Sequence, residues 1–110
     1  MKIELPVKPL SNNKMWQGRR FKTDDYLLYE QEVYFSIRGG LRLEGNVEVW
    51  YRFYIKNDKL TDCDNLIKPL QDILVKRGVI EDDRKIIAFH AEKFHSDVHK
   101  IEIEILPYVR

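Results

Sequence analysis

Residues 47–55 read VEVWYRFYI, and this stretch alternates between two kinds of position. Every second side chain is apolar or aromatic, at positions 47, 49, 51, 53 and 55, whereas charged Glu48 and Arg52 stand between them. Successive side chains of a β-strand point to opposite faces of its sheet. The pattern therefore predicts a strand over residues 47–55 with one face against a hydrophobic core.

An amphipathic helix is predicted after this strand, over residues 65–77. Its apolar side chains recur at helical spacing, at Leu66, Ile67, Leu70, Ile73 and Leu74. Gly78 should end it. Proline has no N–H and clashes with the preceding turn, so the regular helix should begin no earlier than about Asn65, or else bend at Pro69. Asp64 or Asn65 would then be the N-cap.

Another helix is predicted before the strand. Residues 23–25 are Thr, Asp and Asp, which are good N-cap and first-turn residues, and Gly39-Gly40 should stop the helix near Arg38. Lys2 to Val7 has the pattern of a short first strand. Leu10 to Lys22 shows turn residues without a clean period, which indicates a loop.

Two strands are predicted at the C-terminal end, over residues 86–94 and 98–106. His95-Ser96-Asp97 separates them, which is typical of a hairpin. Ile101, Ile103 and Ile105 should face inward. The order β-α-β-α-β-β predicts an α+β fold, with a single mixed sheet of about four strands and two helices, in one domain over residues 1–110.

Composition limits the class of protein. One cysteine cannot form an internal disulfide, and no apolar run approaches the roughly 20 residues that cross a bilayer, so we expect a cytoplasmic protein without a membrane span. The net charge is only +1, but the signs are segregated. Residues 8–22 carry five basic and no acidic side chains, whereas residues 58–83 hold six aspartates and one glutamate. A chain this small would gain stability from dimerisation.

The acidic segment suggests a metal site. In an extended segment, Asp62 and Asp64 would point the same way while Cys63 points the other. The adjacent carboxylates of Glu81, Asp82 and Asp83 repel one another and destabilise the fold unless a cation neutralises them. Oxygen ligands favour Mg²⁺ or Mn²⁺ over zinc. Aspartates also gather in turns and at helix N-termini for structural reasons alone.

A row of charged side chains follows on the second predicted helix. Asp64, Lys68 and Asp72 stand at i, i+4 and i+8 and therefore project from one face. The row fits a lysine held among carboxylates. It also fits an ordinary solvated face with weak salt bridges.

Other metal and nucleophile motifs fail. An EF-hand loop starting at Asp62 would need a glycine where Ile67 stands and a glutamate where Ile73 stands. The three histidines lack partners at zinc-ligand spacing and are expected to be structural or on the surface. Cys63 lies between two anions, which raise a thiol pKa, so we expect it to pack rather than react.

The residues resemble the RusA-type Holliday junction resolvases. The similarity comprises Asp62-Cys63-Asp64-Asn65-Leu66-Ile67-Lys68, Asp72-Ile73-Leu74, Gly78-Val79-Ile80 and Asp82-Asp83. These match the family signature D-x-D-N-x-x-K, D-x-L and G-hydrophobic-x-x-D-D in residue type and spacing. Pro9-Leu10-Ser11-Asn12-Asn13-Lys14 is similar to the family's proline-serine-asparagine segment.

The resemblance implies roles for individual residues. Asp62, Asp64 and Asp83 would be metal ligands, Lys68 would be the essential catalytic lysine, and Asp72 and Asp82 would be supporting acids. The basic loop would contact DNA through Lys14, Trp16, Arg19, Arg20 and Lys22, with Trp16 stacking on bases or packing within the loop.

The resemblance also implies an activity. We expect a Mg²⁺-dependent endonuclease that resolves four-way DNA junctions by paired symmetric nicks in recombination and repair, as a homodimer without a small-molecule cofactor. Two alternatives remain. The acids could serve a metal-dependent nuclease on other branched or single-stranded nucleic acid, or they could be structural in a non-catalytic junction-binding protein.

Overall fold

The computed structural model describes residues 1–14, 16–17, 21–56 and 62–109. In chain order its main elements are β1 (Lys2–Leu5), α1 (Asp24–Ser36), β4 (Val47–Ile55), α2 (Ile67–Lys76), β5 (Ile86–His95) and β6 (Lys100–Pro107). Short elements are η1 (Asn12–Lys14), β2 (Trp16–Gln17), β3 (Phe21–Lys22), η2 (Cys63–Leu66) and η3 (Asp83–Lys85). The predicted α+β class and the order of the main elements are confirmed.

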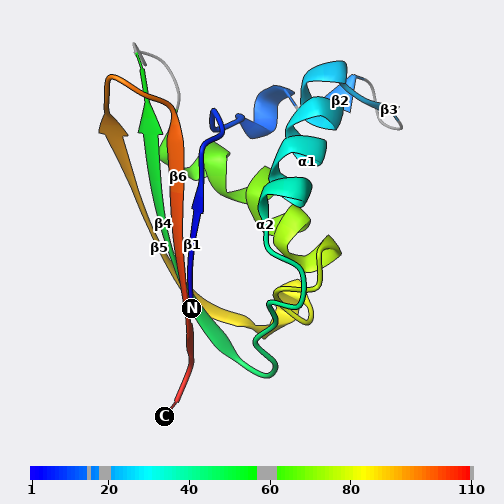
Figure 1. The fold of residues 1–110 in the computed structure, drawn as a ribbon, viewed down its shortest axis with the longest axis vertical. Coiled ribbons are helices and arrows are strands. Elements are labelled where there is room, and N and C mark those ends of the chain that lie inside the picture. The colour runs from blue at the N-terminus through cyan, green and yellow to red at the C-terminus, as the bar shows by residue number, and fades with distance from the viewer. Residues whose placement is uncertain (15, 18–20, 57–61, 110) are drawn as a thin grey trace.

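One four-stranded mixed sheet carries both α-helices on the same face (Figure 1). Its strand order is β1-β6-β4-β5, in which β4 pairs with β5 in parallel and with β6 in antiparallel fashion. The parallel pair is joined through α2, because parallel strands need a long crossover connection. A separate two-stranded pair, β2 with β3, lies in the segment predicted to be a loop.

The hairpin predicted between the last two strands is wrong, because β4 lies between β5 and β6. The connection at residues 96–99 passes around the end of β4 instead. There Ser96 N donates to Ile55 O at 3.1 Å, and Lys56 N donates to His99 Nδ1 at 3.3 Å. A short polar connection between two strands fits either arrangement, so the sequence pattern could not choose between them.

Strand β4 has the predicted bounds and burial. Its odd-numbered side chains are all buried, and its even-numbered ones are half-buried on the opposite face of the sheet. Ile101, Ile103 and Ile105 of β6 are buried on the same side, as predicted. The core therefore lies between one face of the sheet and the two α-helices (Figure 1).

Helix α1 begins where its sequence indicated. The Thr23 hydroxyl accepts a hydrogen bond from Tyr26 N at 3.1 Å, which caps one of the first backbone N–H groups. Asp24 and Asp25 in the first turn face the positive end of the helix dipole. Tyr29 and Val33 are buried against the sheet side of the helix.

Helix α2 is preceded by a 3₁₀ turn rather than by a capping side chain. The N-cap position is Asp62 for η2 and Leu66 for α2, and neither side chain makes a capping hydrogen bond. The predicted N-cap at Asp64 or Asn65 is therefore wrong. Pro69 lies in the first turn, where its missing N–H costs nothing. Gly78, with a φ of 83°, ends the helix and lets Val79 N donate to Leu74 O at 3.0 Å.

Within the described residues, no helix is both long and apolar enough to cross a membrane.

Candidate active site

Asp62 and Asp64 lie between the end of β4 and the start of α2, and both are exposed. Asp62 is extended, with φ −75° and ψ 138°, but Asp64 belongs to the 3₁₀ turn η2. Asn65 N donates to Asp62 O at 3.1 Å and closes that turn. The predicted extended arrangement of the two carboxylates is therefore wrong, because the chain turns at Cys63 before it enters α2.

Lys68 stands in the first turn of α2 with its side chain exposed. Its Nζ lies 2.8 Å from Asp72 Oδ1, one turn further along the helix, so the predicted i, i+4 pair forms. The hydrogen bond to Asp72 raises the pKa of Lys68, and the negative charge of Asp83 adds to this effect. The lysine is therefore a fixed positive charge close to two carboxylates at neutral pH.

The acidic run at residues 81–83 is more neutralised than its sequence suggests. Glu81 Oε1 accepts from Gly45 N at 3.1 Å. Asp82 Oδ2 lies 3.0 Å from Arg84 Nη2, and Asp82 Oδ1 accepts from Arg84 N at 3.0 Å. The hydrogen bonds from the Arg84 side chain and backbone hold the pKa of Asp82 far below its usual range. Asp82 thus has a structural role in starting η3 and places Asp83 next to it on an exposed turn.

Three segments therefore bring the predicted residues to one region. Elements η2 and η3 both contact α2, at whose start Lys68 stands. Among the described residues, no three His, Cys, Asp or Glu side chains converge closely enough to form a ready-made metal site. The donor set is nevertheless of the right chemistry, since Asp62, Asp64 and Asp83 offer exposed carboxylates that can turn towards a hard divalent cation.

His90 lies on the surface as predicted, whereas the prediction that Cys63 is packed is confirmed only in part. Burial raises the pKa of the Cys63 thiol, Lys93 opposes that effect, and Asp64 and Glu92 reinforce it. The thiol is only half-buried rather than packed in the core. His90 is on the sheet surface, where its ring stacks on Trp50 at 3.8 Å and its Nε2 lies 3.1 Å from Glu48 Oε1.

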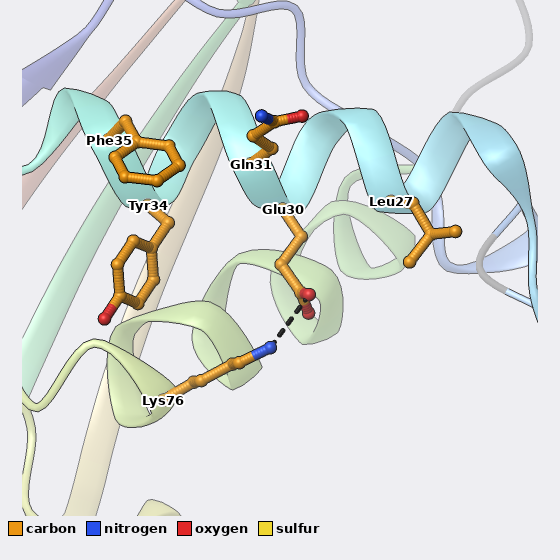
Figure 2. Close-up of a pocket in the computed structure, with 6 residues that line it drawn as sticks. All are labelled: Leu27, Glu30, Gln31, Tyr34, Phe35 and Lys76. Carbon is orange, nitrogen blue, oxygen red and sulfur yellow. Dashed lines mark hydrogen bonds and ion pairs between the residues drawn. The ribbon is translucent and has the colours of Figure 1, made fainter.

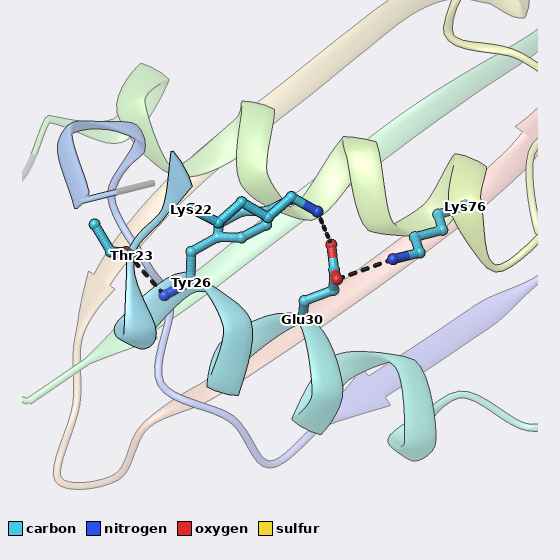
Figure 3. Close-up of polar contacts among 5 residues, drawn as sticks. All are labelled: Lys22, Thr23, Tyr26, Glu30 and Lys76. Carbon is cyan, nitrogen blue, oxygen red and sulfur yellow. Dashed lines mark hydrogen bonds and ion pairs between the residues drawn. The ribbon is translucent and has the colours of Figure 1, made fainter. Parts of the chain in front are cut away.

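Lys22 is the one predicted DNA contact whose side chain is described. Its Nζ lies 2.9 Å from Glu30 Oε2, and Lys76 Nζ lies 2.9 Å from the other oxygen, Oε1 (Figure 3). The Lys22 ammonium also lies 5.2 Å from the centre of the Tyr26 ring. Arg19 and Arg20 lie outside the described residues, as do the side chains of Lys14 and Trp16.

Sequence reasoning missed Glu30, which joins three elements. It stands on α1 and binds one lysine from β3 and one from α2, with only 14% of its side chain exposed. Burial alone would raise the pKa of Glu30, but hydrogen bonds from Lys76 and Lys22 outweigh it and leave that pKa below its usual value. The partners lie 8 and 46 residues away along the chain, so no local pattern could have revealed the cluster.

A hollow of about 310 Å³ lies on the outer side of the helical layer (Figure 2). Its lining comes from α1 and α2, at Leu27, Glu30, Gln31, Tyr34, Phe35 and Lys76. Lys76 and Lys68 are eight residues apart on α2, which is about 12 Å along the helix axis. The hollow therefore lies towards the opposite end of α2 from the acidic residues.

Comparison with known proteins relates the chain to one family and to a phage protein. The profile of a family described as Endodeoxyribonuclease RusA matches residues 6–106 of this chain. The chain is also 43% identical over 44 residues to "Crossover junction endodeoxyribonuclease rusA" of Lactococcus phage r1t. That second match spans 40% of this chain and 34% of the phage protein. Every candidate acid and Lys68 fall within the family match.

Proposed function

Because the chain belongs to the RusA endodeoxyribonuclease family, we propose that it is a divalent-metal-dependent endonuclease that resolves four-way DNA junctions. The phage relative named as a crossover junction endodeoxyribonuclease supports the same substrate. Recombination and repair are the processes that generate such junctions, and the cytoplasm is where we place the enzyme.

The observation that carries this proposal is the position of Lys68 among exposed carboxylates. It is paired with Asp72 at 2.8 Å and lies within electrostatic range of Asp83. Ordinary surface salt bridges would explain the contact between Lys68 and Asp72. They would not explain why residues from η2, α2 and η3 lie near the start of one helix. Metal-dependent phosphodiester cleavage uses such an arrangement, in which acidic ligands hold a metal ion and a cationic side chain lies beside the phosphate.

Asp62, Asp64 and Asp83 would hold Mg²⁺, with Mn²⁺ as a substitute. When bound, the metal supplies an activated water and neutralises charge on the phosphate and on the departing 3′ oxygen. Lys68 remains protonated and donates to a non-bridging phosphate oxygen, which stabilises the charge that grows in the transition state. Asp72 keeps the lysine chain directed along the helix face, and Asp82 holds η3 so that Asp83 stays at the site.

Two further features belong to the proposal. Lys14, Trp16, Arg19, Arg20 and Lys22 grip the junction near its branch, and Lys22 exchanges Glu30 for a phosphate when it does so. A four-way junction has two-fold symmetry and needs two nicks, so a homodimer with two identical sites acts on it.

The test is cleavage of a labelled synthetic four-way junction beside linear duplex, flap and single-strand controls. Wild-type protein, Asp64→Asn and the control Asp97→Asn, at an exposed aspartate in the β5–β6 connection, are compared with Mg²⁺ and with EDTA. We expect paired symmetric nicks only with Mg²⁺, in wild type and Asp97→Asn alone.

Other outcomes refute the proposal in distinct ways. Preferred cleavage of flaps or single strands would identify a nuclease of different substrate. Tight junction binding without any cleavage, equal with and without Mg²⁺ and unchanged by Asp64→Asn, would identify a non-catalytic junction-binding protein.

A further inference from the structure

Helix α1 carries large apolar side chains on two faces. Tyr29 and Val33 are buried against the core, but on the other face Leu27, Leu28 and Phe35 are 48%, 56% and 75% exposed. A helix with one face in the core and one in water normally has a polar outer face. Clustered exposed apolar side chains of this kind mark a surface that another molecule covers.

The outer face of α1 also borders a hollow. The hollow of about 310 Å³ lies beside Phe35 and is lined by Leu27, Gln31 and Tyr34, with the Lys76–Glu30 ion pair at one wall (Figure 2). An exposed aromatic ring and a hollow of suitable size thus lie on the same helix. A surface that carries both a protruding side chain and a hollow that can receive it is self-complementary, so a second copy of the chain can bind to it.

The spacing of the outer residues is symmetric about Gln31. In an antiparallel pair of α1 helices related by a two-fold axis at Gln31, residues equally distant from it face each other. Leu27 then meets Phe35 of the other copy, and Leu28 meets Tyr34. Asp24, in the first helical turn, faces Arg38, which follows the helix end; both are exposed and of opposite charge.

We propose that the outer face of α1 is the homodimer interface, with two α1 helices antiparallel across a two-fold axis at Gln31 and each Phe35 seated in the hollow of the other copy. The existence of a dimer rests on the proposed function, whereas its location rests on this surface. An interface of ordinary size buries about 800 Å² per partner, more than one face of a short helix provides, so the dimer should dissociate on dilution.

The first test measures self-association by sedimentation velocity over a dilution series. Phe35→Asp is compared with wild type and with Phe89→Asp, which changes a 52% exposed phenylalanine on β5. We expect Phe35→Asp to raise the dimer Kd more than about tenfold, because it places a charge in an apolar contact twice per dimer. Phe89→Asp should leave the Kd unchanged. Thermal unfolding of each variant confirms that it is folded.

A second test locates the symmetry axis. Cys63 is the chain's single cysteine, so Gln31→Cys in a Cys63→Ser background presents one thiol per copy. Mild oxidation should link two copies through residue 31. Glu32→Cys in the same background, one residue further around the helix, should link far less. Equal linking by both variants, or a dimer weakened by Phe89→Asp and not by Phe35→Asp, overturns the proposed interface.

These outcomes separate the interface from the function. A wild-type dimer that cleaves junctions and survives Phe35→Asp refutes the interface and leaves the function standing. A dimer that Phe35→Asp disrupts, in a protein that cleaves no junction, supports the interface and refutes the function. A wild-type protein that sediments as a monomer at all concentrations refutes both the interface and the dimeric mechanism.

Discussion

The Lys68 ammonium lies 2.8 Å from the Asp72 carboxylate, one helical turn away, on the exposed side of α2. The two side chains are 54% and 34% exposed, so water screens the pair and it adds little to the stability of the fold. Its contribution is to hold a positive charge in place at the start of the helix, next to the acidic turns.

Lys68→Ala should abolish junction cleavage and leave junction binding. The ammonium acts on charge that develops in the transition state, and removal of one such donor typically lowers the rate about 100-fold or more. Cleavage under single-turnover conditions and binding by gel shift separate the two effects. A variant that cleaves at the wild-type rate would show that Lys68 has no catalytic role.

Asp72→Asn should change the alkaline side of the pH–rate profile rather than the fold. The hydrogen bond to Asp72 raises the pKa of Lys68, so its loss lowers that pKa and moves the fall in activity at high pH to lower pH. Stability should change by no more than about 0.5 kcal/mol, as for other i, i+4 pairs. An unmoved profile would mean that Asp72 does not act through the lysine; Asp97→Asn is the matched control.

Glu30→Gln should destabilise the fold in a pH-dependent manner. At pH 7 the loss of two ion pairs should cost roughly 1 kcal/mol. The folded pKa of Glu30 lies below its usual value, so its contribution is present above about pH 4.3 and disappears as pH falls through the folded pKa. Urea unfolding at several pH values measures this, with exposed Glu32→Gln as control. A difference that persists at the lowest pH would contradict it.

Tyr29→Phe should leave stability unchanged or raise it slightly. The Tyr29 hydroxyl is buried and, among the described residues, forms no hydrogen bond of standard geometry. Burial raises the pKa of Tyr29, and the Leu10 backbone acts to lower it but leaves the hydroxyl under-satisfied, so its removal should cost little. The matched variant is Tyr51→Phe, since the Tyr51 side chain is also buried but its hydroxyl donates to Gln71 Oε1 at 3.1 Å. That change should cost about 1 kcal/mol. Equal destabilisation by both, measured by thermal unfolding, would indicate that the Tyr29 hydroxyl has a partner.

Mg²⁺ should stabilise the protein through the three exposed aspartates. A ligand at one hundred times its Kd adds about 2.7 kcal/mol to the free energy of unfolding. We therefore expect the melting temperature to rise with Mg²⁺ in wild type and in Asp97→Asn, but not in Asp83→Asn. A rise retained in Asp83→Asn would remove that residue from the ligand set.

Local patterns predicted the elements of this fold well. The strand at residues 47–55 was predicted with its observed bounds, because alternation of apolar side chains is a property of neighbouring residues. Helix α1 begins at the expected Thr23 cap for the same reason. The pairing of strands was less predictable. The sequence of residues 95–97 does not indicate that β4 lies between β5 and β6. That arrangement depends on the distant crossover through α2.

The candidate site was predictable in composition but not in geometry. The spacing of Lys68 and Asp72 on one helix fixed their contact in advance. The turn at Cys63 and the pairing of Asp82 with Arg84 depend on 3₁₀ segments whose sequences have no clear period. Glu30 was missed because its two lysines come from distant parts of the chain.

The crossover between β4 and β5 also bears on how the protein folds. Parallel strands cannot pair through a tight turn, so the ladder between them forms only once the intervening chain has closed into a large loop and packed on the sheet. That loop contains η2, α2 and η3, and with them every candidate acid and Lys68. The acidic residues should therefore acquire their arrangement in the slow, cooperative step that completes the sheet, and amides of α2 and β5 should gain exchange protection in a single kinetic phase.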